Sequence, residues 1–308
     1  MINYYYSNIR NNGIKNIPES RKGCWVHVVD PSEQEIDRIV SEFSLEKDLI
    51  KDALDIYEAP RVEKDDGSVY LFTRYCFPEG VDIATEPLLL IYTKEVLITV
   101  LRRNSGILDG MFSPKRTIVT SQRTKTLLEI LVEVNRSYEK YMQKVGRLIL
   151  SIRSQLSKTD IRNEDFIEFI DLEENLNEFM SALQPQSAML RSLIGRKYFP
   201  LFDEDKDLIE DLSLGTSELI EIIMTRLKTI SNTREAYATI MANTLNKTFK
   251  KLTSISIFMT IPMITTGLYG MNLALPLQKN PFAYWYILFF VMSMTAICVW
   301  LFKKLRWL

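Results

Sequence analysis

The last quarter of this 308-residue chain lacks acidic side chains. All 39 Asp and Glu residues lie at or before Glu235, together with all but seven of the 38 Lys and Arg residues. An acidic N-terminal part joined to a basic and apolar C-terminal part is typical of a membrane-anchored protein. The same distribution argues against a protein that binds nucleic acid.

Cysteine and histidine are also scarce. The three cysteines, Cys24, Cys76 and Cys298, have no metal-ligand spacing and fit a reducing or bilayer environment rather than a disulfide framework. Cys24 precedes the single histidine, His27, by three residues, but we expect His27 to be a partly buried strand residue rather than a metal ligand. The chain lacks a G-x-G-x-x-G motif, a Walker A motif and paired catalytic carboxylates with a base, so nothing specific supports an enzyme.

Two C-terminal runs carry no charge. Phe282–Phe302 is long enough to cross a hydrocarbon core about 30 Å thick as a helix. Leu252–Leu268 is also uncharged, and its six hydroxyl residues suit a helix that lines a water-filled path or packs on sister helices. These hydroxyl residues are Thr253, Ser254, Ser256, Thr260, Thr265 and Thr266.

The basic residues around these runs predict their orientation, because cytoplasmic flanks are rich in Lys and Arg. The connecting loop, Tyr269–Pro281, has only Lys279. We therefore expect a multi-pass protein of the cell (plasma) membrane with both termini in the cytoplasm and the loop outside. The flanking basic residues are Lys247, Lys250, Lys251, Lys303, Lys304 and Arg306.

The remaining sequence predicts a mixed α/β part followed by long helices. No proline occurs between Leu201 and Ile261, so a helix that begins near Asp203 can continue into the first uncharged run. At 1.5 Å per residue it would be roughly 90 Å long, and its apolar stripe predicts packing against copies of itself. The earlier elements that we expect are strands at 23–29 and 68–77, helices at 32–43 and 46–57, a hairpin of 88–92 with 96–101, a short helix at 106–112, and helices at 124–156 and 163–194.

One face of the long helix carries polar residues where it enters the bilayer. Asn246, Phe249, Thr253, Ser256 and Thr260 follow one another at intervals of three and four residues and form one seam. In a symmetric bundle, neutral oxygen atoms on this seam suit a hydrated Mg²⁺, while Phe249 and its neighbour Leu252 would provide an apolar constriction. The seam could instead be a polar contact between helices.

The tetrapeptide Tyr269-Gly270-Met271-Asn272 follows the first run directly. Gly270 permits a positive φ and a close approach of backbones, and Asn272 offers a neutral carbonyl at the outer mouth of a pore. A lone Gly-Met-Asn is a weak motif, but its position at the end of the first of two C-terminal spans makes it specific.

With these features the sequence resembles the CorA family of magnesium transporters, also called the two-TM GxN family, over essentially its whole length. The resemblance implies a funnel-shaped homopentamer in which stalk helices and first spans line the pore. It also implies that intracellular Mg²⁺ bound between subunits closes the pore. We therefore expect no enzyme but a Mg²⁺ channel, with passive flux down the electrochemical gradient and Co²⁺ or Ni²⁺ as alternative substrates.

The resemblance assigns roles to individual residues. The pore-entry asparagine corresponds to Asn246, the hydrophobic gate to Phe249 and Leu252, and the polar pore ring to Thr253. Ser256 and Thr260 continue the pore lining, and the selectivity motif corresponds to Gly270, Met271 and Asn272. Regulatory metal binding is expected at Asp211 with a carboxylate near Glu79 or Asp82, although Asp211 could equally be a solvated surface residue.

Some features depart from the family pattern. Loop residues Leu273–Pro281 contain no carboxylate, whereas the family commonly has one there, and this difference should weaken the long-range attraction of cations. A zinc transporter, a cobalt or nickel transporter of the same family and a non-conducting membrane-anchored scaffold stay as alternatives. Met271 argues modestly against zinc.

The expected fold class is α+β with a membrane part. A cytoplasmic α/β domain is followed by antiparallel helices, a stalk helix and two transmembrane helices. We expect a homo-oligomer that contacts membrane lipid and divalent cations but binds no nucleic acid. The expected segments are the α/β domain (1–117), the antiparallel helical pair (118–202), the stalk (203–251), the first transmembrane helix continuous with it (252–268), the extracellular loop (269–281), the second transmembrane helix (282–302) and the basic cytoplasmic tail (303–308).

Overall fold

The computed structural model describes residues 1–9, 13–79, 82–112, 118–156, 163–195, 198–272, 275–277 and 279–305. The chain divides into two compact units, Met1–Ser231 and Asn232–Leu308. The first unit contains a mixed sheet and most of the helices. The second contains the C-terminal part of one long helix and the last helix.

The described part of the first unit contains a seven-stranded sheet with the strand order β2-β1-β3-β7-β6-β5-β4. Strands β3 and β7 are parallel, and every other neighbouring pair is antiparallel. The predicted hairpin is confirmed as β6 and β7. The strands are β1 Ile2–Tyr6, β2 Lys15–Ile17, β3 Trp25–Val29, β4 Arg61–Asp65, β5 Ser68–Glu79, β6 Asp82–Tyr92 and β7 Leu97–Leu101.

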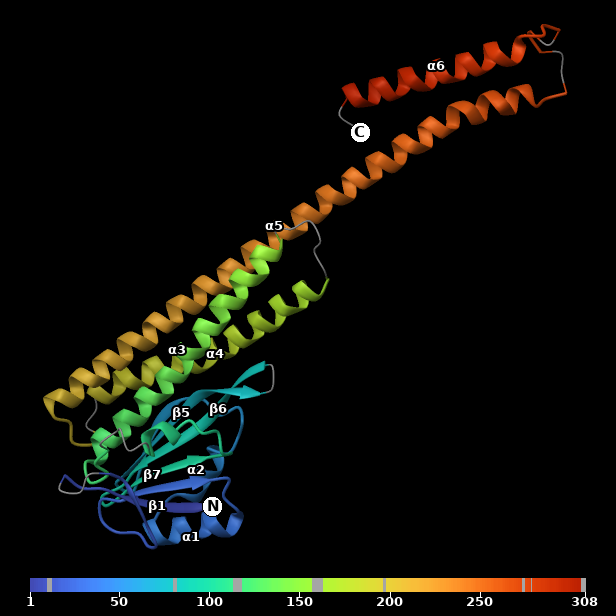
Figure 1. Cartoon of the computed structure of the whole chain (residues 1–308). Coiled ribbons are helices and arrows are strands. Elements are labelled where there is room, and N and C mark those ends of the chain that lie inside the picture. The colour runs from blue at the N-terminus through green and yellow to red at the C-terminus, as the bar shows by residue number, and fades with distance from the viewer. Residues whose placement is uncertain are drawn as a thin grey trace. The chain divides into compact units, whose positions relative to one another are not determined.

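Both faces of this sheet are covered by helices (Figure 1). Side chains alternate between the faces along a strand, so in β6 Leu88 and Leu90 join the core under the long helices, whereas Leu89 and Ile91 join the core against α1 and α2. Burial on both faces explains why β6 contains an unbroken apolar run rather than an alternating pattern.

Helix α1 (Glu33–Phe43) begins where the sequence predicts, because Ser32 and Glu35 form a capping box. The Glu35 amide donates to Ser32 Oγ (3.3 Å), and the Ser32 amide donates to Glu35 Oε2 (2.9 Å). Helix α2 (Lys47–Asp52) is shorter than predicted. Beyond it the Asp55 carboxylate accepts the Tyr57 amide (3.0 Å), and such side-chain bonds to backbone compete with a helix.

Three strands are absent from the sequence prediction: β1 at the start of the chain, and the edge strands β2 and β4. Edge strand β2 has only three residues, and edge strand β4 has four charged residues among its five, so neither shows an apolar alternation. The helix predicted over 106–112 is only a single 3₁₀ turn, η1 (Asp109–Phe112).

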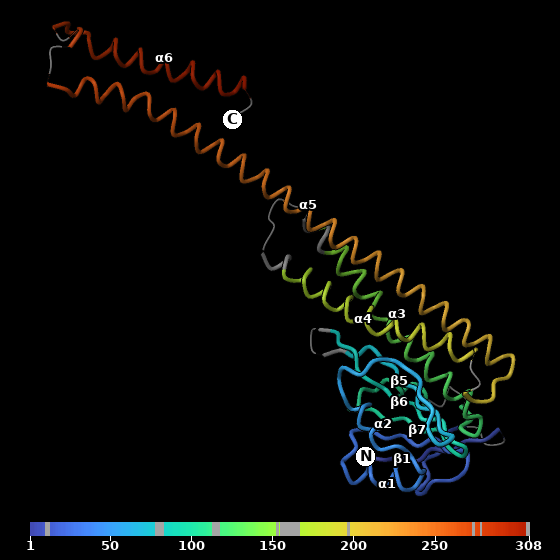
Figure 2. Tube along the Cα trace, turned by 180° about the vertical axis from the view of Figure 1, so that it is seen from behind, coloured from blue at the N-terminus to red at the C-terminus, as the bar shows by residue number. Residues whose placement is uncertain are grey.

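Three long helices lie side by side over one face of the sheet (Figure 2). They are α3 (Arg123–Leu156), α4 (Asn163–Gly195) and the first part of α5 (Asp203–Tyr269). Helices α3 and α4 contact β5 and β6 directly. Their start and end points agree with the sequence prediction to within one residue.

A chain of buried polar side chains connects these three helices to the sheet. Thr73 Oγ1 on β5 donates to Gln186 Oε1 on α4 (2.9 Å), and Gln186 Nε2 donates to Asn135 Oδ1 on α3 (2.8 Å). Asn135 Nδ2 then donates to Thr216 Oγ1 on α5 (3.0 Å). Leaving one buried partner unsatisfied costs about 1–3 kcal/mol, so the network fixes how the helices align on the sheet.

In the second unit, α5 and α6 (Ala283–Lys304) run antiparallel. The rings of Phe258 on α5 and Phe302 on α6 meet edge to face with centroids 5.4 Å apart. This contact sets which residues of the two helices lie at the same level.

His27 is a partly buried residue of β3, as predicted. Its Nδ1 lies 2.8 Å from Thr99 Oγ1, which also accepts the Trp25 indole N–H (2.9 Å). Because the indole can only donate, the Thr99 hydroxyl proton is available to His27 Nδ1, which favours the neutral imidazole. Burial lowers the pKa of His27 from 6.5 to about 4.

This pKa shift predicts acid destabilisation with a defined sign. Between pH 6.5 and 4 the unfolded chain protonates His27 while the folded chain does not, so stability falls as the pH falls through this window. The loss is about 3 kcal/mol at most. Urea unfolding at about pH 7 and about pH 4.5 measures it, with His27→Gln as the control that lacks this contribution. Equal acid sensitivity of the two proteins would contradict the assignment.

Candidate functional site

Two described helices are long and apolar enough to cross a membrane. They are α5, through its C-terminal part, and α6. A membrane-spanning helix must pair its backbone groups in hydrocarbon, and a continuous helix does so internally except where a proline lacks the N–H, as at Pro262 of α5. These helices are therefore the candidate membrane spans predicted from the uncharged runs.

Helix α5 has two different sides in this region. Ser254 is fully buried and Phe258 and Thr265 are partly buried, and all three lie on the side that faces α6. At 3.6 residues per turn, the centre of the seam from Asn246 to Thr260 lies roughly 140° around the helix from that side. The packing of α6 thus leaves the seam exposed on this chain. Its exposed residues are Asn246, Phe249, Leu252, Thr253, Ser256 and Thr260.

The hydroxyl groups of Ser256 and Thr260 in the seam donate to their own helix. Ser256 Oγ donates to the Leu252 carbonyl (3.0 Å), and Thr260 Oγ1 donates to the Ser256 carbonyl (2.8 Å). A hydroxyl whose proton is engaged in this way presents only oxygen lone pairs to its surroundings. This geometry suits a cation or the water hydrogens of its hydration shell, and it does not suit an anion.

The tetrapeptide Tyr269–Asn272 ends α5. The Gly270 amide donates to the Thr266 carbonyl (2.9 Å), and a Cβ added at Gly270 would lie 3.2 Å from that carbonyl oxygen. Gly270 does not adopt a positive φ here, so it serves close backbone approach rather than a left-handed turn. Met271 and Asn272 are exposed next to it.

The predicted regulatory residues belong to the first unit. Asp211 is exposed on α5. Glu79 and Asp82 pair through their backbones at the tip of the β5–β6 hairpin, but their side chains lie outside the described part of the structure. Among the described residues, no three His, Cys, Asp or Glu side chains gather to hold a metal ion. Arg306 of the predicted basic tail also falls outside the described residues.

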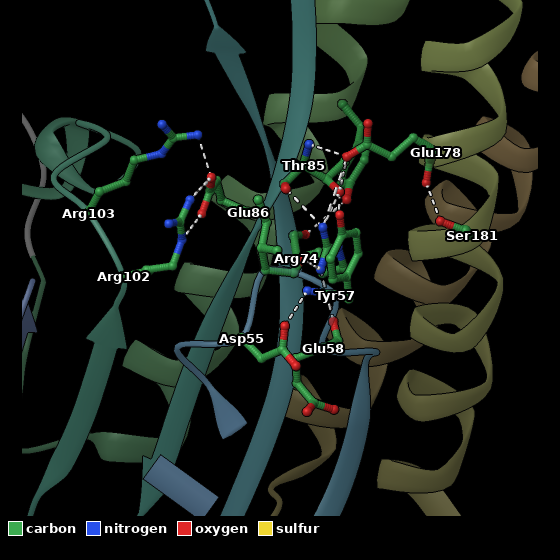
Figure 3. A network of polar contacts seen from close by, with 12 residues as sticks. Asp55, Tyr57, Glu58, Arg74, Thr85, Glu86, Arg102, Arg103, Glu178 and Ser181 are labelled. Atoms are coloured by element: carbon green, nitrogen blue, oxygen red, sulfur yellow. Dashed lines mark hydrogen bonds and ion pairs between the residues drawn. The ribbon is translucent and has the colours of Figure 1, made fainter. Parts of the chain in front are cut away.

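A cluster of charged side chains on the sheet was not predicted from the sequence (Figure 3). Arg74 is buried and donates to the carbonyls of Ile56 (2.6 Å), Glu58 (3.0 Å) and Thr85 (2.8 Å). Glu178 on α4 accepts both the amide (2.6 Å) and the hydroxyl (2.7 Å) of Thr85.

The fully buried Glu86 accepts two hydrogen bonds from Arg102, at 3.0 and 2.7 Å, and a third from Arg103. Because the chain itself satisfies these charges, the cluster holds the sheet together and is no candidate for catalysis. Sequence spacing could not have found it, since its members come from strands and helices far apart in the chain.

The α/β domain, the polar seam and the two C-terminal spans define a class of proteins, the two-span membrane transporters. The sequence model of the family described as CorA-like Mg²⁺ transporter protein matches residues 20–304. The chain belongs to the CorA family, whose members are membrane transporters of Mg²⁺ and cobalt.

Individual relatives agree with this assignment. Over 305 residues the chain is 26% identical to the cobalt/magnesium transport protein CorA of Methanocaldococcus jannaschii, and the match covers 94% of this chain and 93% of that protein. The complete structure of the CorA magnesium transporter from that organism matches with a TM-score of 0.85 and 23% identity, covering 100% of this chain and 99% of the other. The full-length CmaX protein matches with a TM-score of 0.78 at 15% identity, with coverage of 100% and 98%.

Proposed function

We propose that copies of this chain form a channel that carries Mg²⁺ passively across the plasma membrane and that intracellular Mg²⁺ closes. The observation that carries the proposal is the seam of α5. It lies opposite the side that packs on α6, it presents acceptor oxygens, and it leads directly to Gly270, Met271 and Asn272. Neutral oxygens suit a cation that sheds its hydration water reluctantly.

A pore of this kind requires several copies of the chain. A single helix cannot enclose a water-filled path, and an exposed stripe with both apolar and polar residues is suited to contact with identical stripes. Phe249 and Leu252, which are 57% and 59% exposed, would then form the apolar constriction. The number of copies, five, rests on the family resemblance.

The direction of transport follows from orientation and charge. With both termini in the cytoplasm, Asn272 meets cations from outside. An inside-negative potential favours entry of a divalent ion by about 4.6 kcal/mol per 100 mV, twice the value for a single charge. This driving force is sufficient for passive entry. The similarity to the cobalt/magnesium transport protein of Methanocaldococcus jannaschii supports Co²⁺ as a second substrate beside Mg²⁺, and Ni²⁺ is the other alternative that we propose.

Regulation would use Asp211 and a carboxylate at the β5–β6 hairpin of a neighbouring copy, Glu79 or Asp82. Asp211 is exposed on α5 and so is available to such a contact. Mg²⁺ bridging two carboxylates of different copies would hold the cytoplasmic domains together and the pore closed.

One prediction of the proposed channel concerns the pore mouth. In liposomes loaded with a Mg²⁺ indicator, Asn272→Ala should lower Mg²⁺ entry by about tenfold or more, because a hydrogen bond to a charged species contributes roughly 1.5–3 kcal/mol. Asn280→Ala is the matched control. Asn280 is a carboxamide of the same loop, but its Oδ1 accepts the Phe282 amide at the start of α6 (2.9 Å), so its replacement should leave entry nearly unchanged.

Two outcomes would contradict this account. Wild-type protein that gives no Mg²⁺ signal at any internal Mg²⁺ concentration would favour the non-conducting scaffold. A signal that survives Asn272→Ala unchanged would refute the role given to the motif.

Another prediction concerns the regulation of the proposed channel by Mg²⁺. Millimolar Mg²⁺ should protect the wild-type protein from proteolysis, and Asp211→Ala should weaken that protection because one carboxylate ligand is lost. The control is Glu210→Ala, which removes the adjacent exposed carboxylate about 100° further around the helix. Equal protection of wild type and Asp211→Ala would count against a regulatory site at Asp211.

A further inference from the structure

One turn of α3 bonds to two other elements of the first unit. Asn135 bonds to α5, Ser137 and Tyr138 bond to β5, and all three side chains are buried. Each of these elements leads to a carboxylate that we propose for the binding of regulatory Mg²⁺. Asp211 lies on α5, and β5 ends at Glu79. The turn of α3 is thus bonded to both elements that carry the proposed ligands.

On α5, Asn135 binds the backbone beside Asp211. Its Nδ2 donates to the Leu212 carbonyl (3.2 Å) and to Thr216 Oγ1 (3.0 Å), and the Thr216 hydroxyl donates to the same carbonyl (2.7 Å). Leu212 and Thr216 are buried, whereas Asp211 is exposed on the same turn. This turn of α5 cannot rotate or slide along α3 without leaving buried polar groups unpaired, which is unfavourable. The position of Asp211 is therefore fixed by α3.

The carboxamide of Asn135 is itself held in one orientation. Gln186 Nε2 on α4 donates to Asn135 Oδ1 (2.8 Å), and Gln186 Oε1 accepts the Thr73 hydroxyl of β5 (2.9 Å). A rotated carboxamide would turn Oδ1 toward the Leu212 carbonyl and bring two acceptors together. Asn135 therefore presents its donor to α5 before any ion binds.

On the sheet, the same turn of α3 binds the backbone of β5. Ser137 Oγ accepts the Cys76 amide (3.0 Å), and the Tyr138 hydroxyl donates to the Arg74 carbonyl (3.0 Å). Cys76 lies three residues before the end of β5 at Glu79. Neighbouring residues of one helix thus hold both the turn of α5 and the strand that leads to the tip of the β5–β6 hairpin.

This arrangement has a consequence for a ring of identical copies. The contacts in such a ring are heterologous, so each copy would give Asp211 to one neighbour and its hairpin to the other. The separation of Asp211 from the hairpin within one chain then decides whether every site of the ring can form at once. Ligands that are fixed before the ion arrives also bind it more tightly, because less conformational freedom is lost.

We propose that Asn135 and Thr216 are positioning residues of the regulatory Mg²⁺ site, which act through Asp211 and touch no ion themselves. They hold Asp211 at a fixed place relative to the β5–β6 hairpin of the same chain. This positioning role rests on the regulatory function proposed for Asp211, and it can fail while that function stands.

The test measures the Mg²⁺ concentration that gives half-maximal protection of the full-length protein from proteolysis. Thr216→Val removes the hydroxyl with little change of volume, and Asn135→Ala removes the carboxamide. We expect each variant to raise this concentration about threefold or more, because one or two buried hydrogen bonds that fix the turn are lost. Mg²⁺ entry into liposomes at low internal Mg²⁺ should stay at the wild-type level, since neither residue lies on the seam.

Two comparisons separate positioning from a general loss of stability. Thr99→Val removes an equally buried hydroxyl, but one that bonds to Trp25 and His27 of β3, and should leave the half-maximal concentration unchanged. In an Asp211→Ala background, Thr216→Val should raise that concentration no further, because its effect acts through Asp211. If Asn135→Ala does not fold, Thr216→Val still decides the question.

Three results would overturn the positioning role. An unchanged half-maximal concentration in Thr216→Val, with Asp211→Ala shifted, would remove it and leave the proposed regulation intact. A further shift when Thr216→Val is added to Asp211→Ala would assign the effect to lost stability. An unchanged concentration in Asp211→Ala would refute the regulatory site and the positioning role together.

Discussion

The structure depends on one constraint, that every backbone amide and carbonyl inside a bilayer must be paired within the protein. Helix α5 meets it as one helix from Asp203 to Tyr269, except that Pro262 has no N–H to donate to the Phe258 carbonyl one turn earlier. The same constraint orients the side chains, because Ser256 and Thr260 give their protons to helix carbonyls. What they offer to a passing ion is therefore oxygen lone pairs, without a fixed negative charge.

The two sides of α5 carry different residues in the membrane part. One side packs on α6 through Phe258. The other side presents hydroxyls and a carboxamide. In the proposed channel, a cation path lined by neutral groups would avoid both tight binding and repulsion of a divalent ion.

Much of the fold could be predicted from the sequence because its signals are local. Each of these signals can be read from consecutive residues: the capping box of Ser32, the uncharged run of α6 and the proline-free stretch of α5. Strands β2 and β4 were missed because each is a short strand at the sheet edge with a single apolar residue, so neither has an apolar alternation. The helix at Lys47–Asp52 was predicted too long because the Asx turn at Asp55 competes with it.

The candidate site could likewise be predicted only where its signal is local in the sequence. The seam follows from helical periodicity, but its position opposite α6 required the packing of the two helices. Partners far apart in sequence, such as Glu86 with Arg102 and Thr73 with Gln186, carry no local pattern. The proposed partner of Asp211 would belong to a second copy of the chain, and one sequence does not determine which carboxylate that copy presents.

The central claim, that the side of α5 opposite α6 lines a water-filled path, is tested most directly by thiol accessibility in the reconstituted protein. In a Cys298→Ala background, Thr260→Cys and Thr265→Cys place one thiol on each side of the helix, whereas the native Cys24 and Cys76 are buried in the first unit. The account predicts that a membrane-impermeant thiol reagent modifies Thr260→Cys much faster than Thr265→Cys, and that Mg²⁺ slows the first reaction. Equal rates at the two positions, or faster reaction of Thr265→Cys, would contradict it.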